Sequence, residues 1–130
     1  MSFDIFVCRF ENGEPAPLDM SAAHEVLAPH VVARDPGLNF LQVSTGAGEG
    51  ADVYLSSPTN ITVNRFGGEG IMNLLAELLR RLDAVLIVPG GPLILLRDED
   101  RERLAPAMRD EWPLVVAHTG AEITEAIRAS

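Results

Sequence analysis

The sequence contains no lysine, because all ten of its basic residues are arginines. This absence excludes chemistry that depends on a side-chain amine. No residue can form a Schiff base with a substrate, and no P-loop lysine can reach a bound phosphate. Arginine does not replace lysine as a general base, because its guanidinium stays protonated at any working pH.

Cysteine is almost absent as well, since Cys8 is the only one in the 130 residues. The chain therefore cannot close a disulfide within itself, which is typical of a protein from a reducing compartment. Cys8 falls in a segment expected to be a buried strand. A thiol in such a place is usually an inert hydrophobic group rather than a nucleophile.

Positive charge is scarce too. Nineteen acidic residues against ten arginines give a formal net charge of −9. Nucleic-acid binding requires clustered basic side chains that neutralise phosphates, and an anionic membrane surface selects for the same clusters. The composition therefore argues against both partners. It leaves two interpretations: acidity that only keeps the protein soluble, or acidity that attracts a basic protein partner.

No hydrophobic run is long enough to span a membrane. The apolar stretch at 84–96 is interrupted by a Pro-Gly-Gly-Pro sequence. The first residues, MSFDIFVCRFENGE, lack the basic start and the cleavage site of a signal peptide. We therefore expect a cytoplasmic protein. A hydrophobic content of 47% with 22% charged residues predicts a single folded domain over residues 1–130.

Hydrophobic patterns predict seven strands and four helices. The strands are expected at residues 3–10, 38–44, 51–56, 61–66, 84–88, 93–96 and 114–118. The helices are expected from a cap at Asp19 or Ser21 to residue 28, at 69–82, at 98–110, and after a capping box at Thr119 and Glu122. Residues 11–17 and 31–37 are expected to be irregular.

The resulting order is β-α-β-β-β-α-β-β-α-β-α, which mixes hairpins with helical connections. This mixture predicts a single-domain α+β fold, with one mixed, largely antiparallel sheet and helices packed mainly on one face. The two apolar runs beside the Pro-Gly-Gly-Pro turn are expected to form a hairpin at the centre of that sheet. Four of their side chains should be almost fully buried: Ile87, Val88, Leu93 and Leu95.

A glycine-rich loop from Gly67 to Gly70 lies between a predicted strand and a predicted helix. This is the layout of loops that hold a phosphate at a helix N-terminus, and Arg65 could assist such a site. Glu69 would repel an anion, however, and the G-x-x-x-x-G-K pattern is absent. A tight turn is the favoured interpretation, and it holds equally for the glycines at 46–50, which no helix follows.

Asp98 and Asp100, with Glu99 between them, could provide the carboxylate oxygens that a hard divalent cation prefers. No EF-hand glycine or twelfth-position glutamate follows them. Acids are also favoured in the first turn of a helix, and three arginines are interleaved with these. A salt-bridged, solvated surface is therefore the favoured interpretation.

The remaining candidates are scattered along the chain. His24, His30 and His118 have no spacing typical of metal ligands, and no G-x-S-x-G elbow marks a serine nucleophile. Trp112 and Tyr54 are single aromatics, which more often pack than bind a ligand. The sequence therefore predicts no catalytic residue, no cofactor and no metal site.

Two segments resemble known proteins. Arg9-Phe10-Glu11-Asn12-Gly13, within the opening MSFDIFVCRFENGEP, is similar to the strand and R-F-x-N-G turn that begin a group of small bacterial proteins of uncharacterised activity. GIMNLLAELL resembles the central helix of that group, and the wealth of Ala, Gly, Pro, Leu and Arg is typical of high-GC, actinobacterial-like genomes. Such small acidic α+β proteins also resemble immunity proteins of bacterial toxin systems, which implies that they act by binding.

Two hypotheses for function follow. The first is a non-catalytic, immunity-like module that binds a basic protein through its acidic surface. The second is a small enzyme or ligand-binding domain whose site assembles only in three dimensions. A deep pocket that gathers His118, Arg65 and one or more carboxylates would favour the second, whereas a flat or shallow acidic surface would favour the first.

Overall fold

The computed structural model describes residues 4–129. Its strands are β1 (Ile5–Glu11), β2 (Glu14–Ala16), β3 (Val31–Asp35), β4 (Phe40–Gly46), β5 (Glu49–Tyr54), β6 (Asn60–Gly67), β7 (Val85–Ile87), β8 (Leu93–Leu95) and β9 (Leu114–Val116). Its α-helices are α1 (Met20–Leu27), α2 (Glu69–Leu82), α3 (Pro106–Glu111) and α4 (Gly120–Arg128). Three 3-10 helices complete the fold: η1 (Ala28–His30), η2 (Pro36–Leu38) and η3 (Asp98–Arg103).

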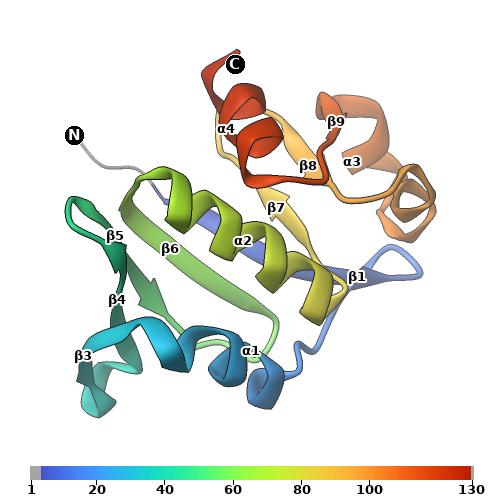
Figure 1. The fold of residues 1–130 in the computed structure, drawn as a ribbon. Helices are drawn as coiled ribbons and strands as arrows, with labels where there is room; N and C mark the ends of the chain where they lie inside the picture. The colour runs from blue at the N-terminus through green and yellow to red at the C-terminus, as the bar shows by residue number, and fades with distance from the viewer. Residues whose placement is uncertain (1–3, 130) are drawn as a thin grey trace.

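The fold is α+β with one mixed, mostly antiparallel sheet, as the sequence predicts. The strand order is β3-β4-β5-β6-β1-β7-β8-β9, and β2 pairs with β1 beside this path. Neighbouring strands run antiparallel except β8 and β9, which are parallel. The sheet forms the back layer in Figure 1, with α1, α2 and α4 in front of it.

The first strand lies in the middle of the sheet, where β6 borders it on one side and β7 on the other. Its side chains alternate between the two faces. Ile5 and Val7 are fully buried beneath the helices, while Phe10 is buried on the opposite face. This confirms the expected strand with apolar residues on both faces; Phe3, its expected first residue, lies outside the described part of the chain.

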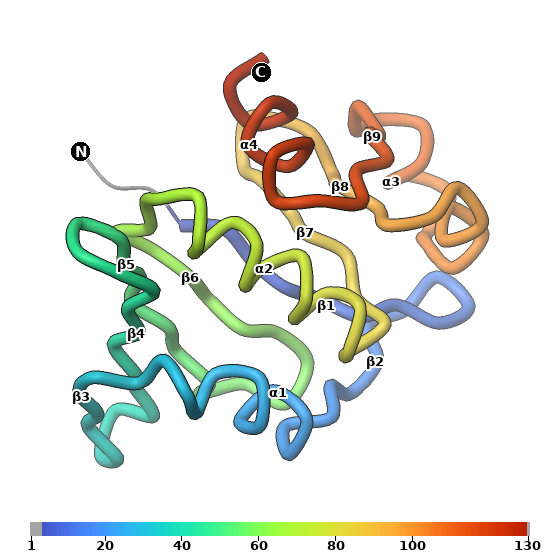
Figure 2. The backbone as a smooth tube through the Cα atoms, in the orientation of Figure 1, coloured from blue at the N-terminus to red at the C-terminus, as the bar shows by residue number. Residues whose placement is uncertain are grey.

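Helix α2 is the centre of the helical layer and extends over the predicted residues, 69–82. Figure 2 shows α1 on one side of it and α4 on the other. Its stripe of Ile71, Leu75 and Leu78 is buried in the main core. At the start of α4, Gly120 lets the two helix backbones meet closely, because a Cβ there would lie 2.5 Å from the backbone nitrogen of Asn73.

A second, smaller core lies on the other face of the sheet. The alternation of β8 divides its side chains, since Leu93 and Leu95 enter this core whereas Ile94 enters the main one. Leu104, just after η3, also belongs to this second core. The 98–111 segment thus covers one end of the face opposite the helical layer, so the sheet is covered on both faces there.

The segment at 11–17 forms a hairpin rather than the expected loop. Asn12 and Gly13 both have positive φ, 53° and 81°, which is the geometry of a two-residue type I′ turn. The Gly13 amide donates to the Arg103 carbonyl oxygen at 2.9 Å. The expectation was wrong because Asn-Gly is a hairpin signal as well as a loop signal, and β2 is only three residues long.

Residues 31–35 were also expected to be irregular, yet they form the edge strand β3. The strand pairs with β4, and its register shifts between Val31 and Ala33 at a bulge. Val32 is 64% exposed there. Pairing with β4, the next strand along the chain, stabilises this strand, whereas the segment itself shows no alternation of apolar and polar residues, so the sequence pattern missed it.

The predicted helix at 98–110 is divided in two. A 3-10 helix ends at Arg103, and α3 begins at Pro106. Proline lacks the amide that a continuous helix needs at this position, but it suits the first turn of a new helix. Leu104 lies in extended backbone between the two pieces and is buried in the second core.

The hairpin of β7 and β8 is correctly predicted, but its position is not, because β6 and β1 occupy the centre of the sheet. The two cores nevertheless bury both of its faces. Val88, Leu93 and Leu95 are almost fully buried, as expected, whereas Ile87 is only half-buried. Across residues 4–129, no helix combines the length and the hydropathy needed to cross a lipid bilayer.

Candidate functional site: an arginine-lined cleft at the end of α2

A cleft of about 490 Å³ opens where the end of α2, the end of β8, η3 and the loop before α4 meet. Charged side chains dominate its wall. The lining residues are Arg80, Asp83, Ala84, Leu96, Arg97, Asp100, Arg103 and His118. These residues are spread over nearly forty positions of sequence, so only the fold brings them together.

Asp83 occupies the position after α2 where helices commonly end in a glycine. Its backbone is left-handed, with φ 54° and ψ 48°. The Ala84 amide donates to the Leu79 carbonyl and the Asp83 amide to the Arg80 carbonyl, which is the pair of bonds of a Schellman motif. The chain turns sharply here and directs the Asp83 carboxylate toward η3.

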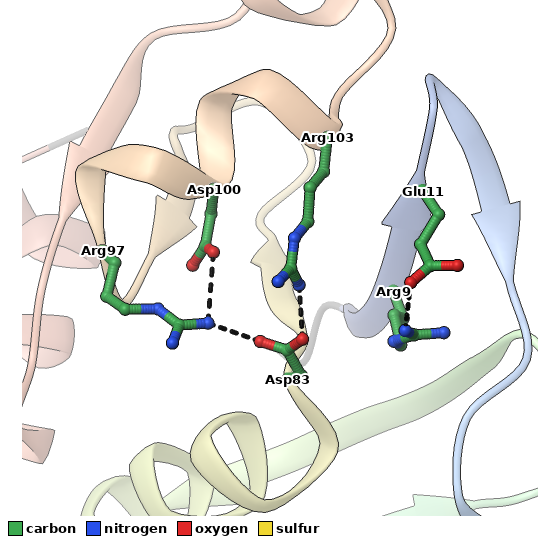
Figure 3. A network of polar contacts seen from close by, with 6 residues as sticks. All are labelled: Arg9, Glu11, Asp83, Arg97, Asp100 and Arg103. Atoms are coloured by element: carbon green, nitrogen blue, oxygen red, sulfur yellow. Dashed lines mark hydrogen bonds and ion pairs between the residues drawn. The ribbon is translucent and has the colours of Figure 1, made fainter.

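The Asp83 carboxylate holds two arginines of the η3 segment, one with each oxygen (Figure 3). Arg97 donates to Oδ1 at 2.5 Å and Arg103 donates to Oδ2 at 2.5 Å. Burial alone would raise the pKa of Asp83, but the hydrogen bonds and charges of Arg103 and Arg97 outweigh it and hold the pKa below its ordinary 3.8. This ion-pair network connects the helical layer to the η3 segment.

Asp100 extends the same network into the interior. It is 5% exposed, and it accepts a hydrogen bond from Arg97 at 3.3 Å. The negative charge of Asp100 is the main cause that raises the pKa of Arg97 above its ordinary value. A buried carboxylate needs a cationic partner, and Arg97 supplies it.

Arg80 and His118 also line the cleft. The Arg80 guanidinium donates to the His118 carbonyl oxygen at 3.4 Å. The His118 amide donates to Glu122, which belongs to the predicted capping box of α4; Thr119 accepts from the Glu122 amide at 3.2 Å. The helix cap therefore fixes the backbone that carries the imidazole.

In the structure a carboxylate of the chain itself lies against the glycine loop, which disfavours a phosphate at that side of the loop. A Cβ on Gly68 would lie 2.4 Å from Glu49 Cγ, and one on Gly70 would lie 2.5 Å from Thr45 Oγ1 and 2.6 Å from Glu49 Oε1. The side chain of Glu49, which also accepts from Thr45, therefore lies against this turn. The glycines make room for a carboxylate of the chain itself, in agreement with the tight-turn interpretation.

The three acids at 98–100 do not converge. Asp98 is exposed and accepts from Arg101 at 2.6 Å, whereas Asp100 points into the cleft and Glu99 lies exposed. Histidines are equally dispersed, since His24 is on the surface of α1 and only His118 lines the cleft. In the part of the chain that the structure describes, no group of three or more His, Cys, Asp or Glu side chains is arranged to hold a metal ion.

Arg65 lies away from the cleft. The structure therefore does not gather Arg65 with His118 and a carboxylate in one pocket, which is the combination expected of a ligand-binding site. Arg65 occupies a bulge of β6 with φ 51°, and its guanidinium lies 3.6 Å from the buried carboxylate of Asp52 on β5. The cleft thus combines His118 with carboxylates, as that hypothesis requires, but with arginines from α2 and η3 in place of Arg65.

Cys8 is partly buried in β1, at the margin of the second core. Burial raises the pKa of its thiol from an ordinary 9.0 to about 11. The thiolate is therefore rare at neutral pH, which agrees with an inert cysteine. The two aromatics pack as expected: Tyr54 lies against Phe40, with ring centroids 5.0 Å apart, and Trp112 borders the second core.

A second feature is an excess of carboxylates beside the cleft. Five exposed acids belong to the β1–β2 hairpin, η3 and α3, and we call them the acidic end: Glu14, Glu99, Glu102, Asp110 and Glu111. The Gly13–Arg103 hydrogen bond brings the hairpin against η3, and Gly13 also lies beside Ala105, the residue directly before α3. Within residues 4–129, none of the five pairs with an arginine, while Arg9 and Arg101 pair with other acids of the same segments.

Sequence reasoning missed the cleft because its charged residues carry no spacing motif. The only local signal is the aspartate directly after a strongly amphipathic helix, where a glycine or asparagine would be ordinary. Searches against known proteins add no assignment to this geometry: no family model, no curated protein and no solved structure matches the chain significantly.

Proposed function

We propose that this protein is a non-catalytic, immunity-like binding module that captures a basic protein through its acidic end. One observation carries the proposal. The neighbouring arginines Arg9, Arg97, Arg101 and Arg103 are engaged with carboxylates of the fold, and Arg109 of α3 offsets one of the five acids, so the acidic end presents an excess of negative charge. Such a surface accelerates encounter with a positively charged partner.

The test compares two variants of equal charge. In the first, Glu99, Glu102 and Glu111 are changed to glutamine; in the second, Glu69, Glu77 and Glu125, which are exposed elsewhere, are changed in the same way. Both raise the net charge from −9 to −6, because three acids are removed. Partners are captured from a bacterial lysate on the wild-type protein, and association rates with the purified partner are measured for all three proteins.

We expect the wild-type association rate to fall steeply as salt rises from about 0.05 to 0.5 M, because exposed charges are screened within a Debye length. The rate of the acidic-end variant should be lower and less dependent on salt, whereas the second variant should follow the wild type. A salt-independent rate, or equal effects of the two variants, would refute the proposed surface.

A second candidate function is the binding of a small ligand, and the cleft is the observation that favours it. The cleft is partly enclosed, lies between several elements, and contains charged side chains above an apolar floor, which are common properties of ligand sites. This function requires no partner protein, so the two candidates can be tested separately.

A further inference from the structure

We infer that the cleft binds a small organic anion, whose carboxylate or phosphate group is held by Arg80, Arg97 and Arg103. The inference rests on the second candidate function and specifies its ligand chemistry. It does not depend on the acidic end, because the cleft and that surface have different residues.

The first argument is an excess of hydrogen-bond donors. A guanidinium has five N–H groups. Arg97 uses one nitrogen, Nη2, for both of its carboxylate partners; Arg103 uses only Nη1 for Asp83, and Arg80 uses only Nη1 for a backbone oxygen. Their other nitrogens have no acceptor within residues 4–129. A ligand rich in acceptor oxygens would satisfy these donors, and a ligand of donors would not.

The second argument is the charge of the cleft. Its three arginines exceed its two carboxylates by one positive charge, in a protein whose net charge is −9. The carboxylates of Asp83 and Asp100 are already engaged with arginines, so they do not offer a site to a cation. The lining of the cleft itself therefore attracts an anion, although the acidic end beside it carries the opposite charge.

The third argument is the shape of the cleft. Its volume of about 490 Å³ exceeds what a bare oxyanion fills, and the buried side chains of Ala84 and Leu96 supply apolar lining. A short carbon chain can lie against this lining while its charged end meets the arginines. The ligand class is thus a small organic acid or phosphate ester rather than an inorganic ion.

The fourth argument is preorganisation. Arg97 and Arg103 are 53% and 37% exposed, yet the Asp83 carboxylate holds both of them in place. Holding the side chains in advance reduces the entropy lost when a ligand binds. This also accounts for an aspartate at a backbone position that suits glycine better, because a glycine could not orient the two guanidinium groups.

The experiment titrates four probes into the full chain at fixed ionic strength and measures binding by calorimetry. The probes are succinate, glycerol phosphate, the uncharged succinamide and the cation putrescine, each up to about 10 mM, well above the range of a weak specific site. We expect saturable binding, with one site per chain, of succinate, of glycerol phosphate, or of both. Binding of one alone identifies the carboxylate or the phosphate as the recognised group.

Two neighbouring arginines of α2 provide the variant and its control. Arg80→Gln removes a guanidinium of the cleft, whereas Arg81→Gln removes an equal charge that pairs with Glu25 outside it. We expect affinity for the anionic probe to fall about tenfold or more with Arg80→Gln and to change less than about twofold with Arg81→Gln. Arg80→Lys should restore part of the affinity, because it restores the charge without the planar donors.

Each other outcome is decisive. Binding of succinamide or putrescine without either anion would refute the inference while leaving a ligand-binding function intact. Absence of binding by all four probes would likewise refute the inference that the cleft binds a small organic anion. Equal weakening by Arg80→Gln and Arg81→Gln would show a nonspecific charge effect and would also overturn the assignment of the cleft.

Discussion

Asp83 stands in a left-handed backbone conformation that disfavours side chains, and its two arginine partners explain why a side chain is retained there. The strain of such a position is of the order of 1–2 kcal/mol. The carboxylate offsets this cost by connecting α2 to the η3 segment. Its pKa is lowered in the folded protein, so this connection depends on pH.

Replacing Asp83 with asparagine tests the connection, because asparagine tolerates the left-handed backbone but carries no charge. At pH 7 we expect a loss of about 1 kcal/mol in the free energy of unfolding, since solvent screens these partly exposed pairs. Because the pKa of Asp83 is lower in the folded state than in the unfolded state, its ionised carboxylate contributes its full stabilisation above pH 3.8. This contribution to the free energy of unfolding disappears as the pH falls through the lower pKa of the folded state.

Urea denaturation of both proteins between pH 7 and about pH 3 measures the effect. The difference in the free energy of unfolding between wild type and variant should shrink as the pH approaches 3. Asp100, Arg80, Arg97, Arg103 and His118 share the cleft but are present in both proteins, so the difference isolates Asp83. A difference that stays constant over this range would contradict the network.

Cys8 gives a second prediction for a single residue. With its pKa raised to about 11, its thiolate fraction near pH 8 is about 100-fold below that of a thiol with the ordinary value of 9.0. We expect a disulfide reagent to label the native protein at least about 100-fold more slowly than the urea-unfolded protein. Equal labelling rates would mean that the β1 thiol is exposed and reactive.

Among the elements, the contact between α2 and α4 depends on one glycine. A methyl group at Gly120 would meet the backbone of Asn73 and Met72 at 2.5 and 2.7 Å, and backbone atoms cannot rotate away. Gly120→Ala should therefore cost about 1–3 kcal/mol through overpacking, despite the better helix propensity of alanine. Gly67→Ala is the matched control, because nothing lies within 4 Å of its added Cβ, and it should stay within about 0.5 kcal/mol of the wild type.

The buried strand β8 gives another prediction at this scale. Leu95 is fully buried in the second core, so Leu95→Ala should lower the free energy of unfolding by about 2–5 kcal/mol. Leu38→Ala removes the same atoms from a side chain that is 62% exposed and should have little effect. Thermal or urea unfolding of the two variants checks this, and similar losses would argue against the second core.

Elements with their own local signal were predictable, and elements that depend on contacts with other segments were not. Helix α2 has a continuous apolar stripe, and α4 begins with a capping box, so a local pattern identifies each helix. Strand β3 forms only because β4 lies beside it, and the break before Pro106 depends on Leu104 entering the second core. The cleft escaped prediction for the same reason, since its arginines meet Asp83 only after the sheet has formed.

For the whole molecule, the absence of lysine and the wide spacing of the histidines still predict a protein without a tightly bound metal or phosphate cofactor. Elemental analysis of protein purified without chelators tests this expectation. A stoichiometric metal would contradict it and would make Asp98, Asp100 and the three histidines the first residues to replace. Weak, reversible binding of an organic anion in the cleft is compatible with the expectation.

The central position of β1 has a consequence for dividing the chain. Val7 pairs with Ile61 on one side and with Leu86 on the other, so the earliest strand joins two parts of the sheet that are synthesised much later. If the chain is split between α2 and β7, the first fragment contains β1 and the second contains β7. Each of these two strands then loses the other as its pairing partner and has an unpaired edge. Neither fragment should fold alone, but together they should reassemble, which makes this junction suitable for a split-protein complementation system.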